Sequence, residues 1–247
     1  MQPSTIVLLH SPLTGAAAWG RLPEVLRAEG LNVVVPEVTG DDQAPYAGRY
    51  VAHAALQIAA NTAQHLAAAE AASGTTSTVL VGHSGAGPLL PQLGFARRSA
   101  HDPVRGYVFL DAGLPRPGAP ASRLDLLAVE DATFASDLRA VLEADGRFPD
   151  WTSSDLVAEV PDPADRALLM ASLRPRPIDF FVEPLPAPID WPDAPCGYLQ
   201  TSSAYDVPAR LARGRGWPTT ELATGHFAAL RDPSATAAAL LGLVERL

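Results

Sequence analysis

The sequence predicts an α/β protein, in which a mostly parallel six-stranded sheet is covered by helices on both faces. Short runs rich in Val, Ile and Leu recur along the chain, and helical patterns separate them. This alternation is typical of parallel strands joined by crossover helices. The runs are apolar throughout instead of alternating with polar residues, which indicates strands that are buried on both faces.

Six runs are expected to form the strands, and the helices are expected between and after them. The strands are predicted at Thr5–Leu9, Leu31–Val35, Thr78–Val81, Arg105–Leu110, Gly197–Thr201 and Pro218–Leu222. The helices are predicted at Arg21–Glu29, Ala52–Ala72, Pro88–Arg98, Pro208–Arg213 and Ser234–Arg246.

Residues 115–195 interrupt this alternation. They contain no convincing strand, but they hold helical patterns at Leu124–Asp145 and Asp162–Leu173 and a proline-rich tail. The aromatic residues of this segment include Trp151, Phe180, Phe181 and Trp191. Because linkers are usually polar, these side chains argue against a linker. We expect a core made of residues 1–114 and 196–247, with residues 115–195 inserted as a lid over the sheet.

The composition restricts the partners of the chain. Its formal net charge of −9 disfavours nucleic acid and anionic membranes, which both reward clustered Lys and Arg. Cys196 is the only cysteine, so an intramolecular disulfide or a thiol metal cluster is excluded. We expect no cofactor and no metal.

The start of the chain lacks a secretory signal pattern and no run is long enough to span a bilayer, so a soluble cytoplasmic protein is expected. The oligomeric state is left open.

The stretch VLVGHSGAGPLL, residues 79–90, lies where the third predicted strand meets a helix. Ligands of open parallel sheets bind at the carboxyl ends of the strands. The pattern is close to the G-x-S-x-G nucleophile elbow, in which a strained serine needs small neighbours two residues away on either side. Gly82 and Ala86 occupy these positions around Ser84. A glycine-rich corner that merely caps a helix is the plainer alternative.

Dinucleotide binding is a second alternative for this turn. Its fingerprint, G-x-G-x-x-G, follows the first strand, and an acidic residue follows about 20 positions later. Here Gly82, Gly85 and Gly87 have the reverse spacing and follow the third strand, although Asp111 does come after the next one. The spacing and the position both argue against this alternative.

A nucleophilic serine needs a base from elsewhere in the chain. His226, in ELATGHFAALRDP, follows the last predicted strand, and its loop is expected to return beside Ser84. A lone histidine is often structural. The chain order, with serine first and histidine last, is nevertheless the order of α/β-hydrolases.

Three stretches together resemble the α/β-hydrolase superfamily over nearly the full chain. They are IVLLHSPLTGAAAW at the first strand, VGHSGAG at the elbow and GHFAALRDP near the C-terminus. The start of the sheet at Thr5 is similar to the compact branch that includes esterases and hydroxynitrile lyases. The resemblance implies an α/β-hydrolase fold with a helical lid and a catalytic triad.

Two aspartates are alternatives for the acid of that triad. The resemblance places the acid after the strand Gly197–Thr201, where Asp206 is the only carboxylate. Asp206 also fits a helix cap, because Pro208 opens a helix behind it. Asp111 ends the preceding strand, and some α/β-hydrolases, including a branch of the haloalkane dehalogenases, are similar in placing the acid there. We favour Asp111, since a buried carboxylate beside His226 would stabilise the imidazolium.

The oxyanion hole departs from the family pattern. The resemblance places one backbone N–H donor just after the first strand, where this chain reads LLHSPLTG with Pro12 at the donor position. Proline has no N–H. Gly85 N–H is expected to be one donor, and either the Leu13 N–H or the Ser11 hydroxyl the other. Losing a donor costs about 10²- to 10³-fold in rate.

The sequence is therefore compatible with three functions. The first is a serine hydrolase for a small, largely apolar ester, thioester or lactone. The second is a cofactor-free lyase, decarboxylase or cyclase that uses Ser84 and His226 as an acid/base pair, which Pro12 favours. The third is a non-catalytic binder, which would need no Ser–His pair. In the first two, the residues expected to bind the substrate are His83, Trp151, Phe180 and Phe181.

Overall fold

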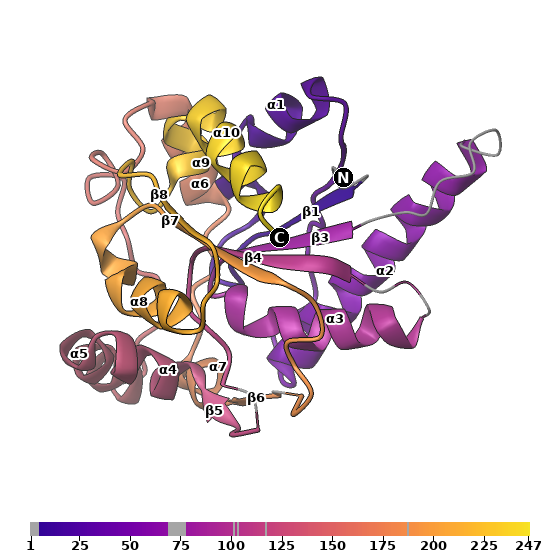
Figure 1. The fold of residues 1–247 in the computed structure, drawn as a ribbon. Coiled ribbons are helices and arrows are strands. Elements are labelled where there is room, and N and C mark those ends of the chain that lie inside the picture. The colour runs from indigo at the N-terminus through magenta and orange to yellow at the C-terminus, as the bar shows by residue number, and fades with distance from the viewer. Residues whose placement is uncertain (1–4, 69–77, 101, 103, 117, 187) are drawn as a thin grey trace.

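The chain forms one six-stranded sheet with helices on both faces in a computed structural model (Figure 1). The structure describes residues 5–68, 78–100, 102, 104–116, 118–186 and 188–247, with the backbone alone for 65–68. The strands are β1 Thr5–Leu9, β2 Asn32–Val34, β3 Thr78–Ser84, β4 Val104–Ala112, β7 Cys196–Gln200 and β8 Thr219–Glu221. Their order is β2-β1-β3-β4-β7-β8, and every pairing is parallel. The predicted fold class is confirmed, and the sheet is parallel throughout.

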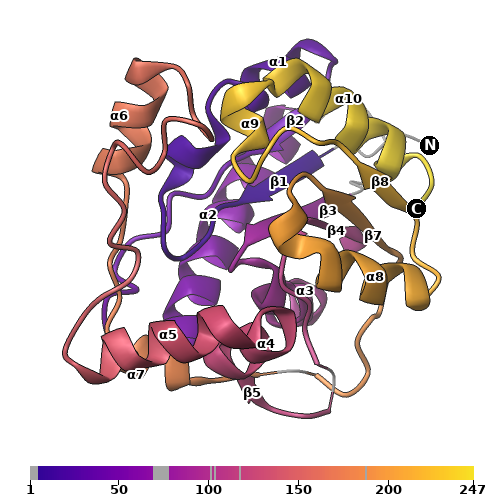
Figure 2. The same cartoon turned by 90° about the vertical axis from the view of Figure 1, so that its left-hand side faces the viewer.

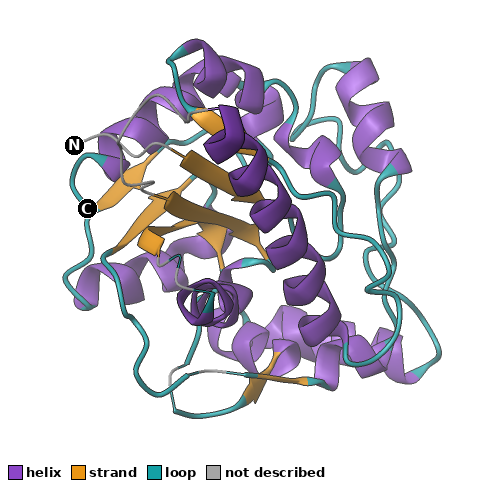
Figure 3. Cartoon of the chain, turned by 90° about the vertical axis from the view of Figure 1, so that its right-hand side faces the viewer, coloured by secondary structure: helices purple, strands orange, loops and turns teal. Residues whose placement is uncertain are grey.

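Helices cover both faces of this sheet, as Figure 3 shows. They are α1 Leu22–Ala28, α2 Tyr46–Ala68, α3 Leu90–Ser99, α8 Asp206–Gly214, α9 Ala228–Arg231 and α10 Pro233–Val244. Ile6 and Leu8 of β1 lie in one buried cluster with side chains of α1 and α10. Val7 and Leu9 lie in the other, with side chains of α2, α3 and α8. This division explains why the strands are apolar on both sides. The predicted helix Ala52–Ala72 begins six residues earlier than expected, and its last four residues lie outside the described part.

The regular structure in the described part of residues 115–195 is mainly helical, with long loops between the helices (Figure 2). Its elements are β5 Ala121–Ser122, α4 Arg123–Glu130, α5 Ala132–Glu143, α6 Pro163–Ala171, α7 Ile178–Val182 and β6 Pro184–Leu185. The expectation of no strand here is wrong by one short antiparallel pair, β5 with β6. The single helical pattern Leu124–Asp145 is two helices, because Asp131 ends α4 and caps α5 by accepting the Phe134 N–H at 2.9 Å. In the part of the chain that is described, no helix has the length and apolar character needed to cross a membrane.

Candidate active site

Ser84 is the last residue of β3 and has a left-handed backbone conformation, with φ of 55°. Such a conformation is strained for a residue with a side chain, and strain of this kind is typical of a nucleophile elbow. The turn also depends on small neighbours. A Cβ on Gly82 would lie 3.1 Å from the side chain of Leu90 and 3.2 Å from the Gly87 nitrogen. The stretch around Ser84 therefore folds as a tight strand–turn–helix corner at the carboxyl end of the sheet.

His226 and Asp111 form a close pair at the same edge. His226 lies in the loop between β8 and α9, and its Nδ1 is 2.8 Å from Asp111 Oδ2 near the end of β4. Asp111 is fully buried. Its carboxylate also accepts the backbone N–H groups of Thr201 and Ser202 and the Ser202 hydroxyl. Burial raises the pKa of Asp111, but the hydrogen bonds from His226, Ser202 and Thr201 outweigh it and hold that pKa below its ordinary value. The imidazole is thus oriented by an ionised carboxylate.

Asp206, the other candidate for the acid, does not reach His226. It is the exposed first residue of α8, and its carboxylate accepts a hydrogen bond from Gln200 Nε2. A carboxylate in the first turn of a helix is stabilised by the helix dipole, which accounts for its presence there. Of the two alternatives, the structure brings only Asp111 to the imidazole.

Tyr205 is a residue of the site that the sequence analysis missed. Its hydroxyl lies 3.2 Å from Ser84 Oγ, and among the described residues no hydrogen bond joins Ser84 to His226. The Tyr205 ring stacks on the His226 ring, with 7° between the planes and 5.1 Å between the centroids. Burial raises the pKa of Tyr205, so its phenol stays neutral. The only sequence signal was its place in the loop after a strand.

A cavity of about 410 Å³, named the Ser84 cavity below, lies beside these residues. Ser84, Gly85 and His226 contribute to its wall. The aromatic residues of the wall are Phe134, Phe148, Trp151, Phe180, Phe181, Tyr205 and Phe227. This set includes the three lid residues that were expected to bind the substrate. Its charged residues, apart from His226, are Arg123, Glu130, Asp155 and Glu159. The cavity is therefore mainly aromatic and aliphatic, as is typical of sites for small organic molecules.

His83 does not line the Ser84 cavity, which corrects its expected role in substrate binding. It is buried, its ring packs near Trp19 and Phe227, and its Nε2 donates to the backbone carbonyl of His226 at 2.9 Å. Burial, aided by the nearby His226, lowers the pKa of His83 to about 3. His83 is thus a neutral donor that holds the His226 loop.

Glu159 holds the same loop through a backbone N–H. Its Oε2 accepts the backbone N–H of His226 at 2.7 Å. The preceding Gly225 has φ of 101°, and a Cβ there would lie 2.4 Å from Glu159 Oε2. Only glycine allows the carboxylate this close. Because Glu159 belongs to residues 115–195, this segment helps to position His226.

The predicted oxyanion donors come from two turns, with Ser11 and Leu13 after β1 and Gly85 after β3. Gly85 and Leu13 line the Ser84 cavity, whereas Ser11 is buried and does not line it. The Leu13 N–H points to Ser11 Oγ at 3.3 Å. The Pro12 carbonyl is turned away and accepts two hydrogen bonds from Arg176, at 3.1 and 3.2 Å.

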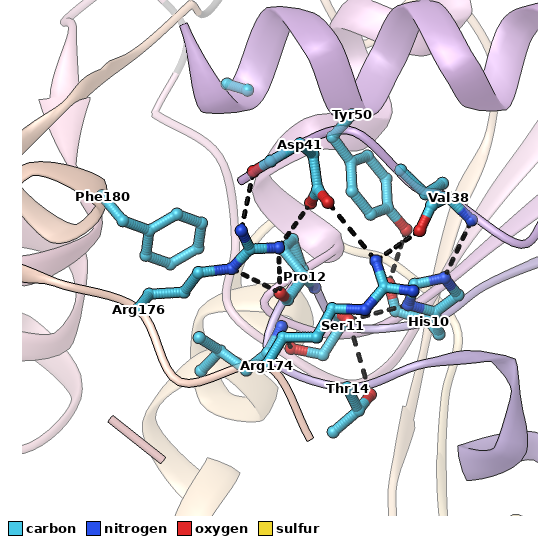
Figure 4. A network of polar contacts seen from close by, with 12 residues as sticks. His10, Ser11, Pro12, Thr14, Val38, Asp41, Tyr50, Arg174, Arg176 and Phe180 are labelled. Atoms are coloured by element: carbon cyan, nitrogen blue, oxygen red, sulfur yellow. Dashed lines mark hydrogen bonds and ion pairs between the residues drawn. The ribbon is translucent and has the colours of Figure 1, made fainter. Parts of the chain in front are cut away.

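A network of ion pairs fixes this turn to residues 115–195 (Figure 4). Arg176 also donates to Asp41 Oδ2 at 2.8 Å, and both side chains are almost fully buried. Arg174 donates to the carbonyl of Val38 and to Asp41, and its backbone N–H donates to the Leu13 carbonyl at 2.9 Å. The turn that carries Leu13 therefore has little freedom to move independently of the segment above it.

A strained serine after a central parallel strand, with a His–Asp pair at the same edge, defines a protein of the α/β-hydrolase fold. Comparison with family models agrees. The chain belongs to the alpha/beta hydrolase family, whose model matches residues 6–239. A search of curated proteins finds no match.

Several solved structures are similar to the chain over nearly its whole length. An extracellular alpha/beta-hydrolase from a Paenibacillus species is 16% identical, with a TM-score of 0.70 and coverage of 98% of this chain and 99% of that one. Tomato methylketone synthase I, solved with 2-tridecanone, is also 16% identical with a TM-score of 0.70, covering 100% and 99%. Polyneuridine aldehyde esterase is 16% identical with a TM-score of 0.66, covering 98% and 99%. At these identities the similarity shows a shared fold and leaves the reaction open.

Proposed function

We propose that the chain is a serine hydrolase that cleaves a small, largely apolar ester, thioester or lactone. The observation that carries the proposal is the 2.8 Å contact between Asp111 and His226 beside a strained serine in the wall of the Ser84 cavity. A buried, ionised carboxylate on Nδ1 leaves Nε2 of the imidazole as the base. The aromatic wall supplies apolar contacts for the substrate.

The proposed reaction follows from these positions. Ser84 Oγ gives its proton to His226 and attacks the acyl carbon. The carbonyl oxygen becomes an oxyanion held by the N–H groups of Gly85 and Leu13. We choose Leu13 over the Ser11 hydroxyl because Leu13 lines the cavity and Ser11 does not. The imidazolium then protonates the leaving alcohol or thiol, and water releases the acid by the reverse steps.

Residues 115–195 serve as the lid in this proposal. They supply Trp151, Phe180 and Phe181 to the wall, and the contacts of Glu159 and Arg176 link them to His226 and Pro12. The lid would exclude water from the reacting atoms. The partner is a small molecule, and a cytoplasmic location stays a prediction of the sequence.

A lyase, decarboxylase or cyclase is the second candidate. Pro12 favours it, because its missing N–H weakens the oxyanion hole that acyl transfer requires. The hydrogen bond between Ser84 and Tyr205 favours it as well, since a serine held by a phenol can exchange protons without becoming acylated.

Labelling with a fluorophosphonate tests the proposal. The reagent phosphonylates an activated serine, and mass spectrometry of peptides locates the adduct. We expect rapid labelling of Ser84 that is lost in Ser84→Ala and slowed strongly in His226→Ala, together with hydrolysis of short acyl esters. An unlabelled Ser84 in a protein whose circular dichroism shows a folded α/β chain would overturn the hydrolase and leave the second candidate.

A further inference from the structure

Helix α4 faces the Ser84 cavity along one stripe. Four of its residues line the cavity: Arg123, Leu126, Leu127 and Glu130. Spacings of three, four and seven residues place these side chains on one face of an α-helix. The two charged residues are therefore separated by about 10 Å along the helix axis. The stripe has a cation at one end, an apolar middle and a carboxyl group at the other end.

The cation at the first end is already paired. Arg123 is buried, donates to the Phe180 carbonyl at 2.8 Å and lies 3.5 Å from Glu183 Oε2. Its guanidinium also stands 3.8 Å above the centroid of the Phe180 ring. The Nε and Nη2 atoms have no hydrogen-bond partner among the described residues, but they have almost no accessible surface. Arg123 in this arrangement is not open to a ligand anion.

The carboxyl group at the second end is unpaired. In the described part of the chain, no hydrogen bond or ion pair reaches Glu130. Its Oε1 lies against Gly113, 2.9 Å from where a Cβ would stand, close to the end of β4 that carries Asp111. Burial raises the pKa of Glu130 to about 7. The charge of Glu130 in turn helps to raise the pKa values of Tyr205 and Tyr198, which stay neutral phenols.

The other two carboxylates of the cavity differ from Glu130. Asp155 accepts the backbone N–H and the hydroxyl of Thr152, both at 2.7 Å. Glu159 accepts the backbone N–H of His226. Glu130 alone of the three is left with its hydrogen-bonding capacity unused.

We infer that the Ser84 cavity binds an ester that carries a protonated amine, with Glu130 as the counter-ion of the ammonium group. The inference rests on the proposed hydrolase function and narrows its substrate class. A carboxylate in an apolar wall is unfavourable until a ligand supplies a donor, and an ammonium group forms a charge-assisted hydrogen bond with it. The ring faces of the wall also attract a cation more than a neutral donor. Three carboxylates and one paired arginine disfavour an anionic substrate.

A pair of isosteric esters tests this inference. Ethyl 4-(dimethylamino)butanoate and ethyl 5-methylhexanoate have the same shape, but at pH 8 the first is a cation. We expect the wild-type protein to have the higher kcat/KM for the amine ester. Glu130→Gln should lower the ratio of the two kcat/KM values about 10- to 100-fold, which corresponds to one charge-assisted contact. Glu143→Gln, an exposed change on α5 with the same loss of charge, should leave the ratio unchanged. If Glu130→Gln leaves the ratio of the two kcat/KM values unchanged, the inference is overturned. Hydrolysis of either ester would still support the proposed function.

Binding to an inactive variant separates the two proposals. In Ser84→Ala, titration calorimetry with the amine ester measures affinity without turnover. We expect binding that weakens about tenfold or more when Glu130→Gln is added. If the wild-type protein hydrolyses neither ester but this Glu130-dependent binding persists, the hydrolase fails and the cavity still selects amines. Equal affinity with and without Glu130 would contradict the inference by itself.

Discussion

Ser84 Oγ and Tyr205 OH lie 3.2 Å apart, so a phenol from the loop after β7 holds the serine that faces the Ser84 cavity. The same phenol ring stacks on His226, the base that would have to take the serine proton. Either hydroxyl of this pair can be the donor; where Ser84 donates, it must give up that hydrogen bond before its proton can pass to His226. In that arrangement the phenol competes with the imidazole for the proton of Ser84.

Tyr205→Phe tests this competition. Phenylalanine keeps the ring that stacks on His226 and removes only the hydroxyl. A hydrogen bond of this kind contributes about 0.5–1.5 kcal/mol, so its loss should speed the reaction of Ser84 with a fluorophosphonate about two- to tenfold. The measurement is the second-order rate constant of labelling. A slower reaction would mean that the Tyr205 hydroxyl donates to the transition state instead.

Asp111→Asn and Asp206→Asn separate the two candidate acids. Replacing Asp111 removes the negative charge on His226 Nδ1 and favours the wrong imidazole tautomer, so kcat should fall about 10³- to 10⁴-fold. Because the hydrogen bonds from His226, Ser202 and Thr201 keep Asp111 ionised, the loss should persist at every pH where His226 is the base. Replacing Asp206 should lower the thermal midpoint of unfolding, since a helix-terminal contact of about 1 kcal/mol is lost. It should leave kcat within a factor of about three, because Asp206 does not contact His226. The reverse pattern would assign the acid to Asp206.

Ser11→Ala distinguishes the two proposed oxyanion donors. The Ser11 hydroxyl now accepts the Leu13 N–H at 3.3 Å, and its removal frees that N–H for a carbonyl oxygen. We expect kcat for an ester substrate to stay constant or to rise. A fall of about 10²- to 10³-fold, the usual effect of removing an oxyanion donor, would instead identify the Ser11 hydroxyl as the donor.

The pair of Arg176 and Asp41 should matter for stability more than for chemistry. Only 5% and 3% of these side chains are exposed, and Arg176 also supports the Pro12 and Asp41 carbonyls. Arg176→Met leaves a buried carboxylate with only Arg174 beside it, so the free energy of unfolding should fall by about 3–5 kcal/mol. Adding Asp41→Asn should recover part of the loss. Urea denaturation measures both changes, and a loss below about 1 kcal/mol for the single variant would show that the pair does not hold the turn.

The strands of the sheet could be predicted from the sequence because burial on both faces makes each strand apolar throughout. The run Thr5–Leu9 shows this pattern without reference to any other part of the chain. The contacts between residues of the site produce no such local sequence pattern. Asp111 and Asp206 both follow predicted strands, and what decides between them is that the loop after β8 returns to the end of β4. Tyr205 lies 121 residues from Ser84, so no local pattern connects them.

Glu130 makes the stability of the fold depend on pH. Its pKa is about 7 in the folded chain, because burial disfavours the charged form, against an ordinary value of 4.5. Between these values the folded chain holds a proton that the unfolded chain has lost, so this residue lowers stability as pH rises from about 4.5 to about 7. Glu130→Gln removes the penalty. The variant should unfold at the same urea concentration as the wild type at pH 4 and should be more stable at pH 8 by up to about 3 kcal/mol. Glu143→Gln, whose exposed carboxylate lies outside the cavity, provides the matched comparison. A gain that is equal at pH 4 and pH 8 would show that the carboxyl group is solvated in the folded protein.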